Sequence, residues 1–397
     1  MTSATLQPPH VRVGPIAWLR VNLFSTWYNA ILSLLIGALL AWVVLQISGW
    51  VLGAARWDVI TRNMRLFLIG QFPADQAWRI WLNLAVISGL AGLSGGSAGG
   101  AVRTLATSVA AAQLLFAGLI AVSGIGLLGS VAYLANAALV WVGLVAGMRR
   151  LVPQRVVTIG WLVSLPASFI LVAGVGDTAI PSVSTNLWSG LLLTFLLATV
   201  GIVLSFPFGV VLALGRRSAL PAVRWLSTAY IELIRGVPLV TILFMADIML
   251  PLFLPGELRI DRVARAMGGI TLFSAAYVAE NVRGGLQAIP TGQVEAAHAL
   301  GLNGFLTNRF IVLPQALRAV IPANVGLFIS LLKDTTLVTI VGLLELLGIG
   351  RSVLAQSESL GAQMEVYVFV AALFFVMSFA MSQASYRLEA SLGVGER

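Results

Sequence analysis

The chain contains no cysteine and only two histidines, His10 and His298. Disulfide frameworks, thiol catalysis and metal sites built from Cys/His clusters are therefore excluded, and we expect no metal site. Charged residues are also scarce, at 10% of the 397 residues, whereas an ordinary soluble domain has about a quarter. Because 59% of the residues are hydrophobic, this composition predicts an all-α, polytopic membrane protein.

Lysine is almost absent as well: Lys333 is the only one, and Leu332 precedes it. A phosphate-binding loop needs a lysine directly after a glycine, so this chain cannot contain one. We therefore expect the chain to be no enzyme and to hold no cofactor of its own. If ATP powers the protein, a separate polypeptide hydrolyses it. The net charge of +9 is explained by arginines at membrane–water boundaries, so no nucleic-acid partner is expected.

Apolar runs long enough to cross a bilayer recur along the whole chain, since a bilayer core needs roughly twenty apolar residues. The basic cluster at 149–155 marks a cytoplasmic side. With a cytoplasmic N-terminus, residues 215–224, 289–318 and the C-terminus lie on that side too. The sequence predicts about ten transmembrane helices, at residues 28–53, 78–93, 104–126, 128–148, 156–175, 188–214, 225–254, 266–288, 319–348 and 366–386.

Two stretches of the first half follow other patterns. In residues 55–72 apolar side chains recur at three- and four-residue steps with arginines opposite, which predicts an amphipathic interfacial helix near 55–72. The glycine-rich run 95–100 follows a span and is expected to be a loop. A third pattern, Arg235-Gly236-Val237-Pro238, should interrupt its helix, because proline removes a backbone donor.

A polar segment at 289–318 separates two predicted spans. It reads Glu295-Ala296-Ala297, then Gly301 after three residues, then Ile311-Val312-Leu313-Pro314 after nine more. We expect Thr291 to cap a short helix with Glu295 near its start, where the helix dipole favours a carboxylate. Gly301 suits the left-handed turn that ends this helix, and a second amphipathic helix should run to a break at Pro314.

This spacing resembles the EAA loop of the permease subunits of ABC importers, and every named position of that loop is present. The stretches 230–238, 283–290 and 332–335 also resemble the polar amino-acid branch of these permeases, and the long chain is similar to the general L-amino-acid permeases. The resemblance implies a five-helix permease core at 181–397 and an accessory transmembrane extension at 1–180. It also implies that the loop contacts an ATPase through Glu295, Ala296, Ala297, Gly301, Ile311, Leu313 and Pro314.

The resemblance implies a function and a set of partners. The function is ATP-driven import of amino acids across a bacterial cytoplasmic (inner) membrane. The partners are a homologous permease subunit in a heterodimer, a cytoplasmic ABC ATPase dimer that binds ATP and Mg²⁺, and a periplasmic or extracellular substrate-binding protein. The sequence leaves open which amino acids are carried and whether the second permease is identical or related.

Ionisable side chains within membrane helices are costly, so those of this chain are candidates for function. Glu232 with Arg235, and Glu280 with Arg283, each lie three residues apart on one helical face. They are either structural ion pairs or a charged lining at the inner mouth of the translocation pathway.

A second polar group, Lys333, Asp334 and Thr335, falls close to the bilayer midplane. Lys333 would meet the carboxylate of an amino acid and Asp334 its ammonium group, or both would hold neighbouring helices in place. Glu280 and Asn281 are the next candidates for the pathway.

Two other functions stay open. A secondary transporter of small polar solutes would use an ion gradient alone, and such proteins often show inverted repeats with broken helices at matching positions. This sequence shows no such pattern. A scaffold protein has no need for charged residues within its spans, so their presence argues against that function.

Overall fold

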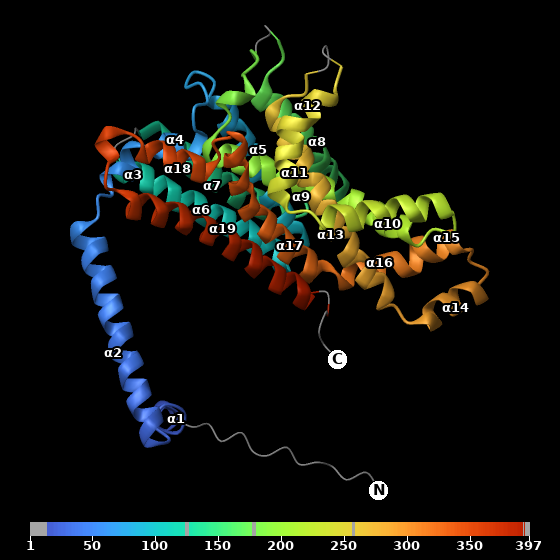
Figure 1. Cartoon of the computed structure of the whole chain (residues 1–397), viewed down its shortest axis with the longest axis horizontal. Helices are drawn as coiled ribbons and strands as arrows, with labels where there is room; N and C mark the ends of the chain where they lie inside the picture. The colour runs from blue at the N-terminus through green and yellow to red at the C-terminus, as the bar shows by residue number, and fades with distance from the viewer. Residues whose placement is uncertain (1–13, 124–126, 177–179, 256–258, 392, 394–397) are drawn as a thin grey trace. The chain divides into compact units, whose positions relative to one another are not determined.

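A computed structural model describes residues 14–123, 127–176, 180–255, 259–391 and 393, which form helices and no strand (Figure 1). The chain divides into two compact units, Met1–Arg56 and Trp57–Arg397. The all-α, polytopic membrane fold predicted from composition is confirmed.

The first unit is dominated by one long apolar helix. Its elements are α1 (Pro15–Asn22), α2 (Trp27–Gly49) and a π-helical turn at Trp50–Ala54. The hydroxyl of Thr26 accepts a hydrogen bond from the backbone N–H of Asn29 and so caps α2. No residue of α2 is buried within the chain, and α2 is long and apolar enough to cross a membrane.

The second unit holds the remaining helices. Before residue 180 these are α3 (Asp58–Arg62), α4 (Met64–Ile69), α5 (Trp78–Ala98), α6 (Gly100–Ser123), α7 (Leu127–Met148) and α8 (Gln154–Ala173). After it come α9 (Gly190–Arg216), α10 (Pro221–Arg235), α11 (Leu239–Phe244), α12 (Leu250–Phe253), α13 (Arg262–Gln287), α14 (Thr291–Ala299), α15 (Gly304–Thr307), α16 (Leu313–Ala319), α17 (Ile321–Asp334), α18 (Leu346–Leu354) and α19 (Gln363–Ser391). Short 3-10 or π turns lie at Thr185–Leu187, Met245–Met249, Asn308–Val312, Thr335–Val341 and Ser357–Ser359.

Among the described residues, eight helices are long and apolar enough to cross a membrane, or nine if the bent pair of α10 with α11–α12 is one span. Helix α13 is not one of them, because it also carries charged residues. Its 26 residues give about 39 Å at 1.5 Å per residue, which exceeds a hydrocarbon core of about 30 Å. Each of the ten predicted spans therefore overlaps a helix or a broken helix, but the one predicted at 319–348 ends at Val341, before α18 begins at Leu346.

The predicted interruption at 235–238 is confirmed. Helix α10 ends at Arg235, Pro238 precedes α11, and the two helical segments are bent by 106°. Residues 225–254 therefore do not form one continuous helix, and that part of the span prediction is wrong. Because proline lacks a backbone N–H and restricts the residue before it, the helix cannot continue straight through this point.

Residues 55–72 do not form the single helix that was predicted, whereas their interfacial position stays a prediction. The chain breaks at Asn63 into α3 and α4. Their apolar side chains are buried with residues of α18 and α19, and the ring of Phe67 packs edge-on against Phe369 with centroids 5.0 Å apart. The amphipathic pattern arises because this apolar face is covered by protein.

Glycines let the backbones of α5 and α7 come into contact. A Cβ on Gly96 would lie 2.2 Å from the carbonyl oxygen of Leu144, and one on Gly147 would lie 2.4 Å from that of Leu93. Helix α5 continues to Ala98, so the loop predicted from residue 95 is wrong up to that point. Small residues at helical spacing permit this close packing of membrane helices.

We expect Gly147→Ala to lower the thermal unfolding midpoint of the protein in detergent. The new methyl would overlap the Leu93 carbonyl and force α5 and α7 apart, at a cost of about 1–3 kcal/mol. Gly118→Ala in α6 is the matched control, because nothing lies within 4 Å of its Cβ position and alanine favours helix. Equal midpoints for the two variants would contradict the close packing.

Fourteen of the 26 residues of α13 are buried. It packs against α9, α10, α11, α16 and α17, and its buried residues contribute to two of the hydrophobic clusters. The polar side chains near its C-terminal end are therefore held in fixed positions relative to several neighbouring helices.

Candidate functional site

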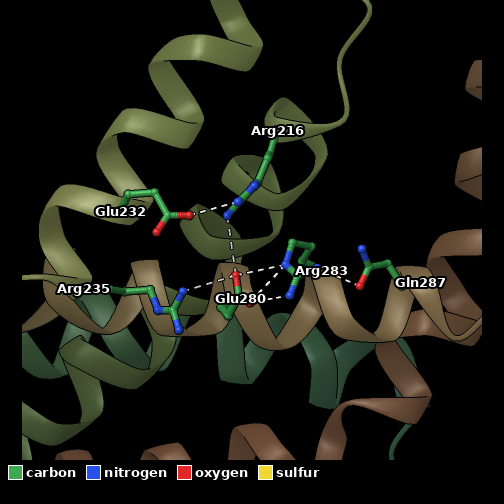
Figure 2. Close-up of polar contacts among 6 residues, drawn as sticks. All are labelled: Arg216, Glu232, Arg235, Glu280, Arg283 and Gln287. Atoms are coloured by element: carbon green, nitrogen blue, oxygen red, sulfur yellow. Dashed lines mark hydrogen bonds and ion pairs between the residues drawn. The ribbon is translucent and has the colours of Figure 1, made fainter.

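Five charged side chains from three helices meet at the C-terminal part of α13 (Figure 2). The carboxylate of Glu280 is their centre. It lies 2.5 Å from Arg283 Nη2, 3.5 Å from Arg235 Nη1 and 3.6 Å from Arg216 Nη1. Arg216 also reaches Glu232, with 2.9 Å between Nη2 and Oε1. The network therefore joins the ends of α9 and α10 to α13.

Of the two ion pairs that the three-residue spacing predicts, Glu280 with Arg283 forms and Glu232 with Arg235 does not. Arg283 donates to Glu280 three residues earlier, through Nε at 3.0 Å to each carboxylate oxygen. Glu232 instead pairs with Arg216, and Arg235 with Glu280. The sequence analysis did not include Arg216 in this charged network. The feature that could have revealed it is its position as the first charged residue after a long apolar run.

The network is only partly exposed and carries an excess of positive charge. The side chain of Glu280 is 22% exposed and that of Glu232 is 56% exposed. Arg235 also lies over the ring of Tyr277, at 5.7 Å from the centroid. Three arginines against two glutamates leave a net charge of +1 (3 − 2).

Next to this network, two asparagines join α13 to α17. Asn281 donates from Nδ2 to Oδ1 of Asn324, over 3.0 Å. Asn324 is buried, and no described residue accepts a hydrogen bond from its Nδ2. The residue that follows Glu280 in the chain is therefore bonded to α17.

The second predicted polar group lies at the end of α17. Lys333 is exposed and Asp334 half-buried, and no ion pair of either is found in the described part of the chain. Thr335 is fully buried, and its hydroxyl donates to the carbonyl of Leu332 over 2.7 Å. Lys333 and Asp334 can thus meet a solute or a partner, whereas Thr335 is used within the chain.

The loop that resembles the EAA loop contains the predicted left-handed turn. Gly301 has φ +80°, and its N–H donates to His298 O over 2.9 Å. The N–H of Leu302 donates to Ala297 O over 3.1 Å. These two bonds form the Schellman motif that ends a helix, and the glycine supplies the conformation that it requires.

Three details of this loop were predicted wrongly. Thr291 does not cap α14: it is the first helical residue, and Pro290 occupies the cap position without a side-chain bond. Glu295 therefore lies beyond the first turn of α14, where the helix dipole stabilises a carboxylate less. The chain also stays helical through Pro314, which is the second residue of α16 and needs no N–H donor there.

Buried and exposed residues alternate along the loop. Ala297, Thr307 and Val312 are buried and anchor it. Glu295, Ala296, Gly301 and Pro314 are exposed, while Ile311 and Leu313 are half-buried. Three large apolar side chains, which sequence reasoning missed, are exposed: Leu300 at 81%, Phe305 at 69% and Phe310 at 60%. In Figure 1, α14 and α15 stand at the end of the second unit that lies away from α3 and α18.

Comparison with known proteins places this arrangement in a family. Residues 205–392 match the model described as the binding-protein-dependent transport system inner membrane component. The inner membrane amino-acid ABC transporter permease protein YhdY of Escherichia coli strain K12 is 37% identical, over 100% of this chain and 99% of its own. The glutamate/glutamine/aspartate/asparagine transport system permease protein BztC of Rhodobacter capsulatus is 36% identical, over 97% and 95%.

A shorter relative matches only half of the chain. The probable glutamine ABC transporter permease protein GlnP of Bacillus subtilis strain 168 is 36% identical over 51% of this chain and 92% of its own. The fold and the matched segment define a multi-pass membrane component of a transport system. The chain belongs to the family of amino-acid ABC transporter permeases, as the motifs of its second half indicated.

We expect Glu280→Gln to destabilise the protein by about 1–2 kcal/mol, because three arginines lose the carboxylate that they share. Glu232→Gln is the control: this more exposed carboxylate has one partner, Arg216, and its loss should cost less than about 0.5 kcal/mol. Thermal unfolding in detergent at low salt measures both. A loss for Glu232→Gln as large as that for Glu280→Gln would show that Glu280 is not the centre of the network.

Proposed function

We propose that this chain is the membrane subunit of an ATP-driven amino-acid importer in a bacterial cytoplasmic membrane. Its partners would be a homologous permease subunit, a cytoplasmic ATPase pair that binds ATP and Mg²⁺, and an external substrate-binding protein. Family membership supports the importer class, and the names of the two full-length relatives support amino acids as the substrate. A secondary transporter is the weaker alternative, because no observation favours it.

The observation that carries the ATPase contact is the loop at 289–318. It lies outside every candidate span, yet it exposes Leu300, Phe305 and Phe310. Large apolar side chains grouped on a surface that lipid does not cover are typical of a protein–protein interface. Glu295 is exposed on the same helix–turn–helix and is free to meet a basic group of the partner.

The loop is also built to transmit motion to α13. A Cβ on Gly285 of α13 would lie 2.8 Å from the carbonyl oxygen of Ala316 in α16. Val312, Ala316 and Val320 are buried in one cluster with residues of α13. A displacement of the loop by an ATPase would therefore reach the helix that carries Glu280 and Asn281.

The pathway itself would use the polar groups of α13 and α17. A zwitterionic amino acid needs partners for its carboxylate and its ammonium group, or desolvation is costly. Lys333 and Asp334 supply one group of each sign without a partner in the described chain, and Glu280 and Asn281 lie on the adjoining helix. We assign Thr335 a structural part in this region, since it is buried.

We further propose that residues 181–397 form the permease core and residues 1–180 an accessory extension. The family match confined to 205–392 and the shorter relative that covers 51% of the chain support this division. The burial of α3 and α4 against α18 and α19 means that the extension also stabilises the core by packing.

Gly301→Val should uncouple ATP hydrolysis from uptake while membrane insertion stays normal. Valine resists φ near +80°, so the angle between α14 and α15 would change. ATPase activity and amino-acid uptake are measured together in proteoliposomes that hold the assembled complex. Gly292→Val is the control. Gly292 is an exposed residue of α14, the helix that ends before Gly301, and its φ is not positive. Normal uptake by an assembled Gly301→Val complex would contradict the coupling role.

Lys333→Met should reduce uptake by at least about tenfold, because the carboxylate of the transported amino acid would lose the charge-assisted bond that Lys333 is proposed to supply. The complex should still assemble and bind nucleotide, which is measured by co-purification and nucleotide retention. Thr336→Val is the control, since the Thr336 hydroxyl already donates to the carbonyl of Lys333. If Lys333→Met transports at the wild-type rate with unchanged preference, the pathway site lies elsewhere, with Glu280 and Asn281 next to test.

A further inference from the structure

Helix α10 carries a row of large, exposed apolar side chains. Trp225, Leu226 and Leu233 are 69%, 62% and 69% exposed. The exposed Ala222 and Ala229 continue the row. These residues recur at three- and four-residue steps, which places them on one side of the helix, and we call them the apolar face of α10.

The other two sides of α10 meet protein and carry charge. Ser227 and Ile231 are buried, and a Cβ on Gly215 of α9 would lie 2.3 Å from the hydroxyl oxygen of Ser227. Arg224 and Glu232 are exposed and, by helical spacing, lie on a third side. A helix with an apolar face that its own chain leaves exposed and a charged side beside it is typical of the membrane–water interface.

Helix α10 lies at the end of a membrane span. Helix α9 is long and apolar enough to cross a membrane, and it exposes Leu204, Phe208 and Val211 on one side. Gly215 continues that side by one turn, and it is there that α10 packs on α9. The apolar face of α10 therefore adjoins the point where the exposed apolar side of α9 ends.

Helix α10 also runs across the membrane helices and not along them. Its axis is turned by 106° from that of α11, as Figure 1 shows. A Cβ on Gly269 of α13 would lie 3.6 Å from the side chains of Leu243 and Ala246, and Asp247 pairs with Arg265 over 3.0 Å. The chain from α11 onward therefore follows α13 in the opposite direction, so α10 lies across α13.

We propose that α10 is an interfacial helix whose apolar face lies among the upper acyl chains of the phospholipid leaflet next to the 289–318 loop. Arg217, directly after α9, donates to Leu286 O over 3.4 Å, so the ends of α9 and α13 lie on the side from which the loop projects. Tryptophan beside leucine is typical of helices at this depth.

The composition of the apolar face favours lipid over a second permease subunit as its occupant. Where α5 and α7 meet closely, glycines such as Gly96 and Gly147 provide the contact, and the apolar face of α10 contains no glycine. Because Glu232 and Arg235 belong to α10, the leaflet would hold one side of the charged network in place.

Since the chain has no cysteine, single spin labels can be placed on α10. Leu226→Cys and Leu233→Cys are labelled in the full-length protein, purified with its bound subunits and reconstituted in phospholipid nanodiscs. Collision rates with oxygen, which concentrates in lipid, and with a nickel chelate, which stays in water, give the depth of each label. Both labels should lie about 5–10 Å below the lipid phosphates. Arg224→Cys, on the charged side of the same helix, is the matched control and should stay accessible to nickel.

Two results would overturn the proposal. Labels at positions 226 and 233 that collide with nickel as often as the label at 224 would place the apolar face in water. Labels that neither reagent reaches would show that a protein subunit covers it.

Trp225 gives a second test that needs no label. Phospholipids brominated on the upper part of the acyl chain should quench a larger share of the fluorescence in the wild type than in Trp225→Phe. Trp188→Phe is the control: Trp188 is only 1% exposed, so its loss should not lower the quenched share. An equal quenched share in the wild type and in Trp225→Phe would contradict lipid contact at α10.

Discussion

The inner arrangement of this protein depends on one carboxylate that three guanidinium groups share. Glu280 faces Arg216, Arg235 and Arg283, so the ends of α9, α10 and α13 cannot separate without exposing unpaired charge. The bend between α10 and α11 lies directly beside this network, because it begins after Arg235. Pro238 prevents a straight continuation, and Arg235, the last residue of α10, pairs with Glu280.

Helix α13 connects the parts on which transport would depend. Its C-terminal half packs tightly on α16, which continues from the projecting loop, and Asn281 bonds to Asn324 of α17. Helix α17 in turn ends at Lys333 and Asp334. A contact made at the loop is therefore linked through packed helices to the charged network and to the polar end of α17.

Local features of the fold could be predicted from the sequence. The spans follow from the length of apolar runs, and the interruption at Pro238 and the turn at Gly301 follow from backbone restrictions of single residues. The features that failed depend on residues far away in the chain. Glu232 pairs with Arg216 of another helix, and the apolar face of α4 is buried by α18 and α19.

Two further features could not be predicted because they also depend on residues far away in the chain. The sequence predicts a loop at Gly96 and a span at Gly147, and the contact of both glycines with the facing backbone follows only when α5 and α7 lie side by side. The exposure of Leu300 and Phe305 depends on how the loop folds back on itself. The family resemblance indicated an ATPase as the partner of this polar segment, and that contact stays a proposal.

We propose that this chain works as one subunit of an ATP-driven complex. It is tested most directly by quantitative mass spectrometry of the complex purified through this chain from its native membrane in mild detergent. We expect stoichiometric recovery of an ATPase with a phosphate-binding loop and of a second permease. Recovery of the chain alone from membranes that remain active in uptake would contradict it.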